Sequence, residues 1–192
     1  LDASIEPLVD LAHADSCDVM SRRADEPDIA CRPFDVDRDG LVLGEGAAFV
    51  VLVRAADAAA AGLLAQAIVA GYASTADAHH LVAPSPSGEA ATRCMRLALA
   101  DADVEATDVA HVNAHGTSTR AGDLMEATAL ARLLGDRTVP VTAVKGTTGH
   151  CLAGSGAIEA VIAARSVRER LVPPVAGLRE VDPKLAVDAV HG

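Results

Sequence analysis

The hydrophobic positions along this chain follow two patterns, continuous apolar runs and helical periodicity, and together they predict a layered α/β fold. A continuous apolar run at residues 47–53 is rich in valine and is typical of a strand buried on both faces. Further apolar runs predict strands at 64–75, 109–116 and 139–146. Helical periodicity predicts helices over residues 5–14, 55–62, 87–104, 122–136 and 153–171. Strands that alternate with helices of this length indicate helices packed against a sheet.

Local signals define the ends of three predicted helices. Ser87 is the expected N-cap of the helix over 87–104. Gly62 and Gly135 are the expected stops of two others. No internal repeat and no linker divides the chain, so one domain over residues 1–192 is expected.

The composition limits the possible functions. Hydrophobic residues make up 51% of the chain and aromatic residues only 2%, so a core of Ala, Val, Leu and Ile is expected. A net charge of -11 argues against a nucleic-acid or membrane-surface role and suits a cytoplasmic enzyme with an acidic face. No run reaches the ~18 apolar residues of a membrane span. The first residue is not Met, and we expect a piece of a longer protein.

The strand predicted at 109–116 ends in a histidine among small residues. Ligands of open α/β sheets bind beyond the carboxyl ends of strands, which is where His115 is expected. Thr117 and Thr119 follow it and offer hydroxyls to a polar ligand. The alternative is a structural histidine whose ring satisfies buried carbonyl groups, and this stretch alone leaves both interpretations open.

A second stretch repeats this design and favours the functional interpretation. The strand predicted at 139–146 carries Lys145 and leads through a Gly-Thr turn to His150, and the next helix carries Glu159. Two histidines at neighbouring strand ends could converge on one ligand oxygen, where neutral imidazoles would stabilise developing negative charge. Lys145 would add positive charge, held in place by Glu159 or Glu126.

Two carboxylates follow the first histidine. Asp123 and Glu126 lie three residues apart on one face of the helix predicted over 122–136. They could support the site, or they could favour the positive start of the helix, and for either residue alone the second explanation is the stronger. A capping box does not account for them, because Thr119 lies four residues before Asp123.

Other binding motifs fail on spacing. The run from Asp35 to Asp39 opens like a calcium-binding loop, but Gly46 stands where the loop needs its final glutamate. Glu159 occupies the place of the third glycine of a dinucleotide fingerprint, and no G-x-x-x-x-G-K occurs. The spacing of histidines and cysteines does not require zinc, so we expect no metal.

Three separate stretches resemble motifs of the β-ketoacyl-acyl carrier protein synthases, the thiolase-fold condensing enzymes of fatty-acid and polyketide synthesis. RPFDVDRDGLVLGEGA (residues 32–47) is similar to the family's RPFD…RDG…GEGA segment. NAHGTST (113–119) is similar to its first histidine motif, and VKGTTGHCLAGSGAIEA (144–160) to the motif with the second histidine. The resemblance covers nearly the whole chain and is closer to the discrete type II synthases than to the modular ones.

The resemblance implies a thiolase-like αβαβα fold, of which residues 1–192 would be the C-terminal half, with a mixed sheet flanked by helices. It implies that His115 and His150 bind the malonyl group and stabilise the enolate formed on decarboxylation. Lys145 would be the motif lysine and Glu159 its ionic partner. The remaining implied residues are two supporting carboxylates, two threonines on the phosphopantetheine arm and one phenylalanine near the acyl or pantetheine channel: Asp123, Glu126, Thr117, Thr119 and Phe34.

The same resemblance implies a reaction and its partners. The reaction would be a decarboxylative Claisen condensation of an acyl thioester with malonyl-acyl carrier protein. It would need no metal and no free cofactor, because phosphopantetheine arrives on the acyl carrier protein. The synthase would be a homodimer or a heterodimer of ketosynthase subunits in the cytoplasm, with no nucleic-acid or membrane partner.

The chain departs from the family pattern at the nucleophile. The family's reactive cysteine lies in the first half of the fold, at a helix N-terminus that would lower the pKa of its thiol. None of Cys17, Cys31, Cys94 and Cys151 has that context, and the glycine-rich gating loop is also missing, so this chain alone would be inactive. Two alternatives stay open: a non-acylating partner subunit resembling a chain length factor, and another acyltransferase of the thiolase fold. A plain binding domain would require all three motifs to be coincidence.

Overall fold

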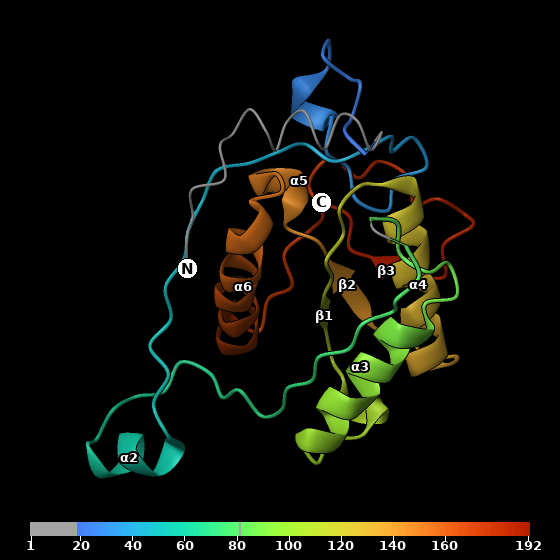
Figure 1. The fold of residues 1–192 in the computed structure, drawn as a ribbon. Coiled ribbons are helices and arrows are strands. Elements are labelled where there is room, and N and C mark those ends of the chain that lie inside the picture. Colours follow the sequence, from blue (N-terminus) through green and yellow to red (C-terminus); the bar gives the residue numbers. More distant parts are fainter. Residues whose placement is uncertain (1–18, 81) are drawn as a thin grey trace.

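The computed structural model describes residues 19–80 and 82–192, which form a small sheet between two layers of helices (Figure 1). The sheet consists of β1 (Val112–Asn113), β2 (Pro140–Thr142) and β3 (Asp188–Ala189), in the order β1-β2-β3. Both strand pairs are parallel. The α/β class is therefore confirmed, whereas the sheet in the described part of the chain is parallel and not mixed.

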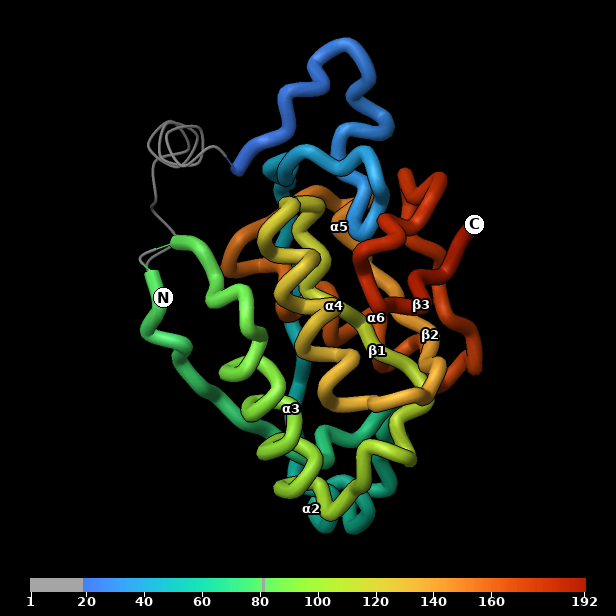
Figure 2. Tube along the Cα trace, turned by 90° about the vertical axis from the view of Figure 1, so that its right-hand side faces the viewer, coloured from blue at the N-terminus to red at the C-terminus, as the bar shows by residue number. Residues whose placement is uncertain are grey.

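Helices cover both faces of this sheet. The helix α6 (Ser155–Glu169) lies on one side, and α4 (Arg120–Leu134), packed against α3 (Glu89–Asp101), lies on the other (Figures 1 and 2). The shorter helical segments are η1 (Pro27–Ile29), α2 (Ala55–Ala60), η2 (Ala106–Asp108), α5 (Lys145–Thr148) and η3 (Leu152–Gly154). Among the residues described, no helix has the length and apolar character needed to cross a membrane.

The core between the layers is built mainly from small and aliphatic side chains, as the composition predicts. Alanines such as Ala127 on α4 and Ala143 after β2 are almost completely buried and allow close packing. Leu130 and Val141 fill the space between α4 and the sheet. Phe34 is the aromatic member of this core, with none of its surface exposed.

Four of the predicted helices are present, with shifted ends. Gly135 is the C-cap of α4, as predicted, whereas the N-cap of α3 is Gly88 and not Ser87. Ser87 Oγ still accepts a hydrogen bond from the backbone N–H of Glu89, at 3.3 Å. The strand predicted at 139–146 ends at Thr142, because the chain turns there into α5. The helix predicted over 5–14 lies outside the described residues.

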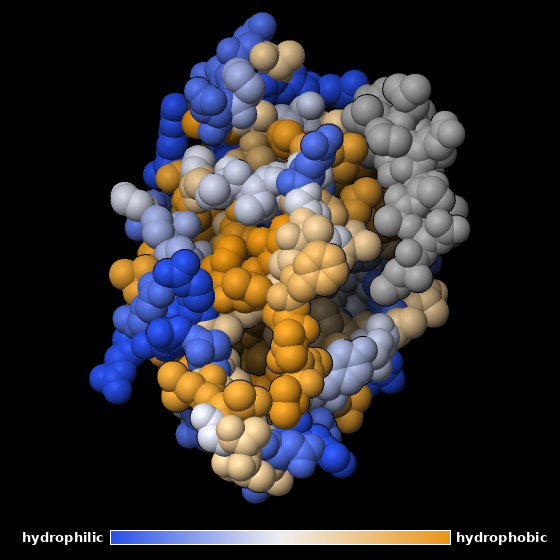
Figure 3. All heavy atoms as spheres, turned by 90° about the vertical axis from the view of Figure 1, so that its left-hand side faces the viewer, coloured by the Kyte–Doolittle hydropathy of each residue, from blue (hydrophilic) through white to orange (hydrophobic). Residues whose placement is uncertain are grey.

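The strands predicted at 47–53 and 64–75 are not formed. The first segment runs in extended conformation down the left side of Figure 1, and no backbone hydrogen bond joins it to another strand within the described residues. Phe49 is 94% exposed and Val51 91% exposed. Hydrophobic side chains gather over this side of the molecule (Figure 3). The apolar pattern thus marks segments with strand character whose pairing partner is not among the described residues.

Candidate active site

The two histidines of the predicted site lie together, although 35 positions separate them in the sequence. The ring centroids of His115 and His150 are 5.2 Å apart, and the rings are nearly perpendicular, at 83°. His115 follows β1, so it lies at the carboxyl end of that strand. His150 is fixed by a third segment, because its N–H donates to Val42 O at 2.7 Å and its carbonyl accepts from Gly44 N at 3.1 Å.

Lys145 determines which nitrogen of His115 carries the proton. Its side chain is 1% exposed, and its ammonium lies 3.2 Å from His115 Nδ1 and donates to the His115 carbonyl at 2.5 Å. The same ammonium forms an ion pair with Glu159, which is the partner that the resemblance implies. Because an ammonium can only donate, His115 Nδ1 must accept and the proton of the neutral ring lies on Nε2.

A backbone group has the same effect on His150. The N–H of Leu152 donates to His150 Nδ1 at 3.1 Å. A backbone N–H has no acceptor capacity, so Nδ1 carries no proton and Nε2 does. Both histidines therefore present an Nε2–H donor, although different groups hold their Nδ1 atoms.

Both imidazoles are neutral near pH 7. Removal from water, together with Lys145 and His150, lowers the pKa of His115 to about 4, even though part of its ring remains exposed. Burial and Lys145 also lower the pKa of His150. Two neutral N–H donors held close together are suited to stabilise an oxygen that gains negative charge during a reaction.

Glu126 shapes the turn that carries His115. Its carboxylate accepts hydrogen bonds from the backbone N–H groups of His115, at 2.7 Å, and Gly116, at 2.8 Å. Burial raises the pKa of Glu126, and these two donors oppose that effect. The turn also needs glycine, because Gly116 has φ 43° and a Cβ there would lie 2.4 Å from Ala143 Cβ. Glu126 therefore positions the turn, and Glu159 is the ion-pair partner of Lys145.

Asp123 joins this turn to the segment around Phe34. Its carboxylate accepts from the backbone N–H of Phe34 at 2.7 Å and of Ser118 at 3.1 Å, and Arg38 Nε lies 3.4 Å away. Burial raises the pKa of Asp123 to about 7, against the opposing effect of these contacts. These tertiary contacts go beyond the helix-start role considered for it. Phe34 lies in the core beside Gly116, so it supports the turn from within.

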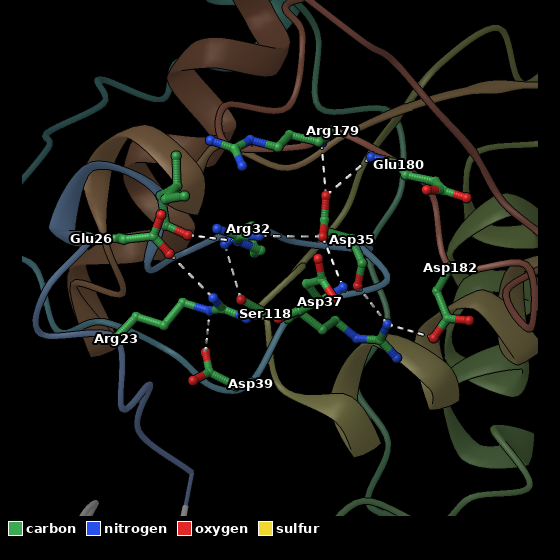
Figure 4. A network of polar contacts seen from close by, with 12 residues as sticks. Arg23, Glu26, Arg32, Asp35, Asp37, Asp39, Ser118, Arg179, Glu180 and Asp182 are labelled. Atoms are coloured by element: carbon green, nitrogen blue, oxygen red, sulfur yellow. Dashed lines mark hydrogen bonds and ion pairs between the residues drawn. The ribbon is translucent and has the colours of Figure 1, made fainter.

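A second polar network holds the 32–39 segment in place (Figure 4). Asp35 accepts from the backbone N–H of Arg179 at 2.7 Å and of Glu180 at 3.2 Å, and it pairs with Arg32 at 3.6 Å. Ser118 Oγ accepts from Arg32 N at 3.0 Å. The acidic run that opens like a calcium loop thus makes its bonds within the protein. In the part of the chain that the structure describes, no group of three His, Cys, Asp or Glu residues could hold a metal ion.

The two threonines lie beside His115 and contact each other. Their hydroxyl oxygens are 2.8 Å apart, and Thr119 is the N-cap of α4, accepting from Gly122 N at 3.1 Å. Thr117 is buried. The motif spacing did not reveal this capping role, because the cap bond goes to the third residue after Thr119 and not to Asp123.

Cys31 does not have the character of a reactive thiol, and two residues outside the predicted set support the site. Burial raises the pKa of Cys31 to about 11, so that thiol is a poor nucleophile, and Cys17 lies outside the described residues. Ser118 and Arg38 support the site through Asp123, although neither is among the residues predicted for the site. Their positions inside the NAHGTST and RPFDVDRDG motifs were the available signal.

The chain matches two family models and several known proteins. Residues 66–179 match the model described as Beta-ketoacyl synthase, C-terminal domain, and residues 7–58 match Beta-ketoacyl synthase, N-terminal domain. The chain is 42% identical over 193 aligned positions to the 3-oxoacyl-[acyl-carrier-protein] synthase 2 of Synechocystis sp., covering 100% of this chain and 46% of that protein. It spans about half the length of the curated relatives it matches.

Two solved structures share the fold. The AntDE:AntF complex, a type II PKS acyl-carrier protein with its ketosynthase bound to the hexaketide, matches with a TM-score of 0.91 and 31% identity, over 95% of this chain and 45% of that chain. The ishigamide ketosynthase/chain length factor matches with a TM-score of 0.87 and 34% identity, over 95% of this chain and 43% of that chain. The expected thiolase-like architecture is thereby confirmed.

Proposed function

Because the chain belongs to the β-ketoacyl synthase family, we propose that the complete protein performs a decarboxylative Claisen condensation of an acyl thioester with malonyl-acyl carrier protein. The observation that carries this proposal is the pair of neutral imidazoles, His115 and His150, with ring centroids 5.2 Å apart. Each has its Nδ1 bonded by a donor, and within the described residues no hydrogen bond occupies its Nε2.

The pair suits the charge that develops in this reaction. Loss of CO2 from the malonyl group breaks a C–C bond and leaves its electron pair on the thioester, as an enolate oxygen. The Nε2–H groups of His115 and His150 would donate to that oxygen as its charge grows. The enolate carbon then attacks the acyl thioester, a new C–C bond forms, and the nucleophile's thiolate leaves. A carbonyl oxygen with less charge gains less from these donors, so the transition state is favoured over the substrate.

The other site residues would position these two donors. Lys145 and Glu159 fix the tautomer of His115, while Glu126 and Asp123 fix its turn and the core around Phe34. Thr117 and Thr119 would contact the phosphopantetheine arm of the carrier protein. The arm arrives on its partner, so the scheme uses no free cofactor and no metal.

The same proposal implies which proteins bind the synthase and which part of it residues 1–192 form. The AntDE:AntF complex contains an acyl-carrier protein, and the ishigamide structure pairs a ketosynthase with a chain length factor, which supports a carrier protein and a second ketosynthase-like subunit as partners. A homodimer is the other arrangement, and a cytoplasmic location suits either. Residues 1–192 would form the C-terminal part of the synthase, with residues 7–58 belonging to its N-terminal domain.

The second candidate function is a non-acylating partner subunit. The observation that favours it is the match to the ishigamide ketosynthase/chain length factor structure, with a TM-score of 0.87 and 34% identity. Both functions use the same fold. An acylated cysteine in the complete protein separates them.

The test uses the complete protein with His115→Ala, His150→Ala and, as a control, the exposed His79→Ala. We expect each site variant to lose about 100-fold or more in malonyl decarboxylation, because one charge-stabilising donor is removed. Transfer of an acyl group to the nucleophile, followed by mass spectrometry of the acylated peptide, should remain. Equal loss of both steps would contradict the assigned roles, and a complete protein without an acylated cysteine would favour the partner subunit.

A further inference from the structure

We propose that Ser155 is a positioning residue for His150, and that its hydroxyl holds the imidazole in the orientation and tautomer that present Nε2–H. This inference rests on the function proposed above. Ser155 Oγ lies 3.2 Å from His150 Nδ1. The side chain is 5% exposed and is the first residue of α6, directly after the short turn η3 that follows His150.

The direction of this hydrogen bond follows from its neighbour. Leu152 N–H already donates to His150 Nδ1 at 3.1 Å, so that nitrogen has a lone pair and no proton. A serine hydroxyl can donate or accept, and opposite an unprotonated nitrogen it must donate. Two donors, one from the backbone and one from a side chain, therefore share the lone pair of one ring atom, Nδ1.

The two histidines differ in how they are held. His115 Nδ1 is bonded by the ammonium of Lys145, which is itself fixed by Glu159. Among the described residues, no charged side chain bonds His150 Nδ1, and its side-chain partner is Ser155. The hydroxyl thus does for His150 what the ammonium does for His115, without adding charge.

The ordinary role of a serine at this place does not explain the contact. Serine near a helix start commonly caps the first turn. The N-cap of α6 is Gly154, and no side chain caps that helix. Within the described part of the chain, the Ser155 hydroxyl forms its hydrogen bond with His150 Nδ1. The hydroxyl is therefore available to the histidine and not engaged by the helix.

The first test is kinetic and uses the complete protein. Ser155→Ala should lower kcat for malonyl decarboxylation about three- to tenfold, the factor that corresponds to one neutral hydrogen bond, with KM within about twofold. Ser155→Thr keeps a hydroxyl and should restore kcat to within about twofold. Ser166→Ala is the matched control, because Ser166 lies on the same helix, is 8% exposed and does not contact the histidine.

The second test measures which nitrogen of the His150 ring carries the proton. In the complete protein with 15N-labelled histidine, the His150 resonances, assigned with His150→Gln, should report an unprotonated Nδ1 and a protonated Nε2. Ser155→Ala should shift the Nδ1 resonance or raise the fraction of the other tautomer, and Ser166→Ala should not. Unchanged resonances in Ser155→Ala would overturn the proposal, whether kcat falls or not, because a loss without a change at Nδ1 is only structural. A wild-type protein that does not decarboxylate malonyl thioesters would refute the proposed function, while the resonances would still test the hydrogen bond.

Discussion

Replacing Lys145 with methionine separates the two effects of its ammonium. The side chain is 1% exposed, pairs with Glu159 and bonds Nδ1 of His115. Methionine has nearly the same length and carries no donor. The variant therefore leaves a carboxylate without its partner and leaves the tautomer of His115 undetermined.

The two losses have different magnitudes. Removing one member of a buried ion pair costs about 3–5 kcal/mol, and Glu159 is 17% exposed, so the lower end of that range applies. If His115 moves its proton to Nδ1, the Nε2–H donor is lost, and loss of one charge-stabilising donor costs about 10²–10³ in rate. The free energy of unfolding should thus fall by about 3 kcal/mol, and malonyl decarboxylation by at least about 100-fold.

The double variant Lys145→Met with Glu159→Gln decides between these effects. It removes both charges, and replacing a buried pair by neutral groups is often close to neutral for stability. We expect urea unfolding of the complete protein to return close to wild type, while decarboxylation stays low because His115 Nδ1 still lacks its donor. Lys184→Met, at an exposed lysine, is the control. Recovery of activity in the double variant would refute the argument, since it would mean that Lys145 only neutralises Glu159.

Two further outcomes follow from the same geometry. Gly116→Ala should lower the free energy of unfolding by about 2–3 kcal/mol, because its Cβ would meet Ala143 Cβ at 2.4 Å. Gly135→Ala, also at positive φ but with no atom within 4 Å, should lower it by only about 1 kcal/mol. Equal losses of the two variants in urea unfolding would contradict the steric argument. The decarboxylation rate should show no change centred on about pH 6.5, the ordinary pKa of histidine, because the pKa of His115 is lowered to about 4 and that of His150 is lowered too. As pH falls below about 6.5 the unfolded histidines bind protons before the folded ones, so stability should fall with pH in that window. A rate change centred near pH 6.5 that disappears in His115→Ala would argue against neutral imidazoles held by donors.

Local sequence patterns predict the helices and helix ends that local interactions determine. Gly135 ends α4 as expected, and the helices at 87–104 and 153–171 are present as α3 and α6. The strand at 47–53 failed for a physical reason. An apolar run indicates a β-prone backbone, but a strand exists only when another strand pairs with it, and the run does not identify that partner.

Sequence motifs predict the site residues that lie within them. Contacts between segments far apart in the sequence are not predictable from these motifs. The motifs predict that His115, Lys145 and Glu159 lie together, and the structure places Lys145 in contact with both His115 and Glu159. The bond from Phe34 N to Asp123 spans 89 positions, and no periodicity in either segment encodes it. The contact of Arg38 with Asp123 has the same origin, since 85 positions separate these two residues.

The exposed apolar segment around Phe49 and Val51 also affects how readily molecules of this chain aggregate in solution. Within the described residues, the backbone of this segment makes no hydrogen bond to another strand and its valine side chains are exposed. Such a segment is a template on which other chains can add. The net charge of -11 opposes such contact, because molecules of like charge repel each other. That repulsion reaches only about 10 Å at 0.1 M salt, so raising the ionic strength removes the barrier before it weakens the apolar attraction. Solutions of the chain should therefore be clearest at low salt and turn cloudy as salt is added.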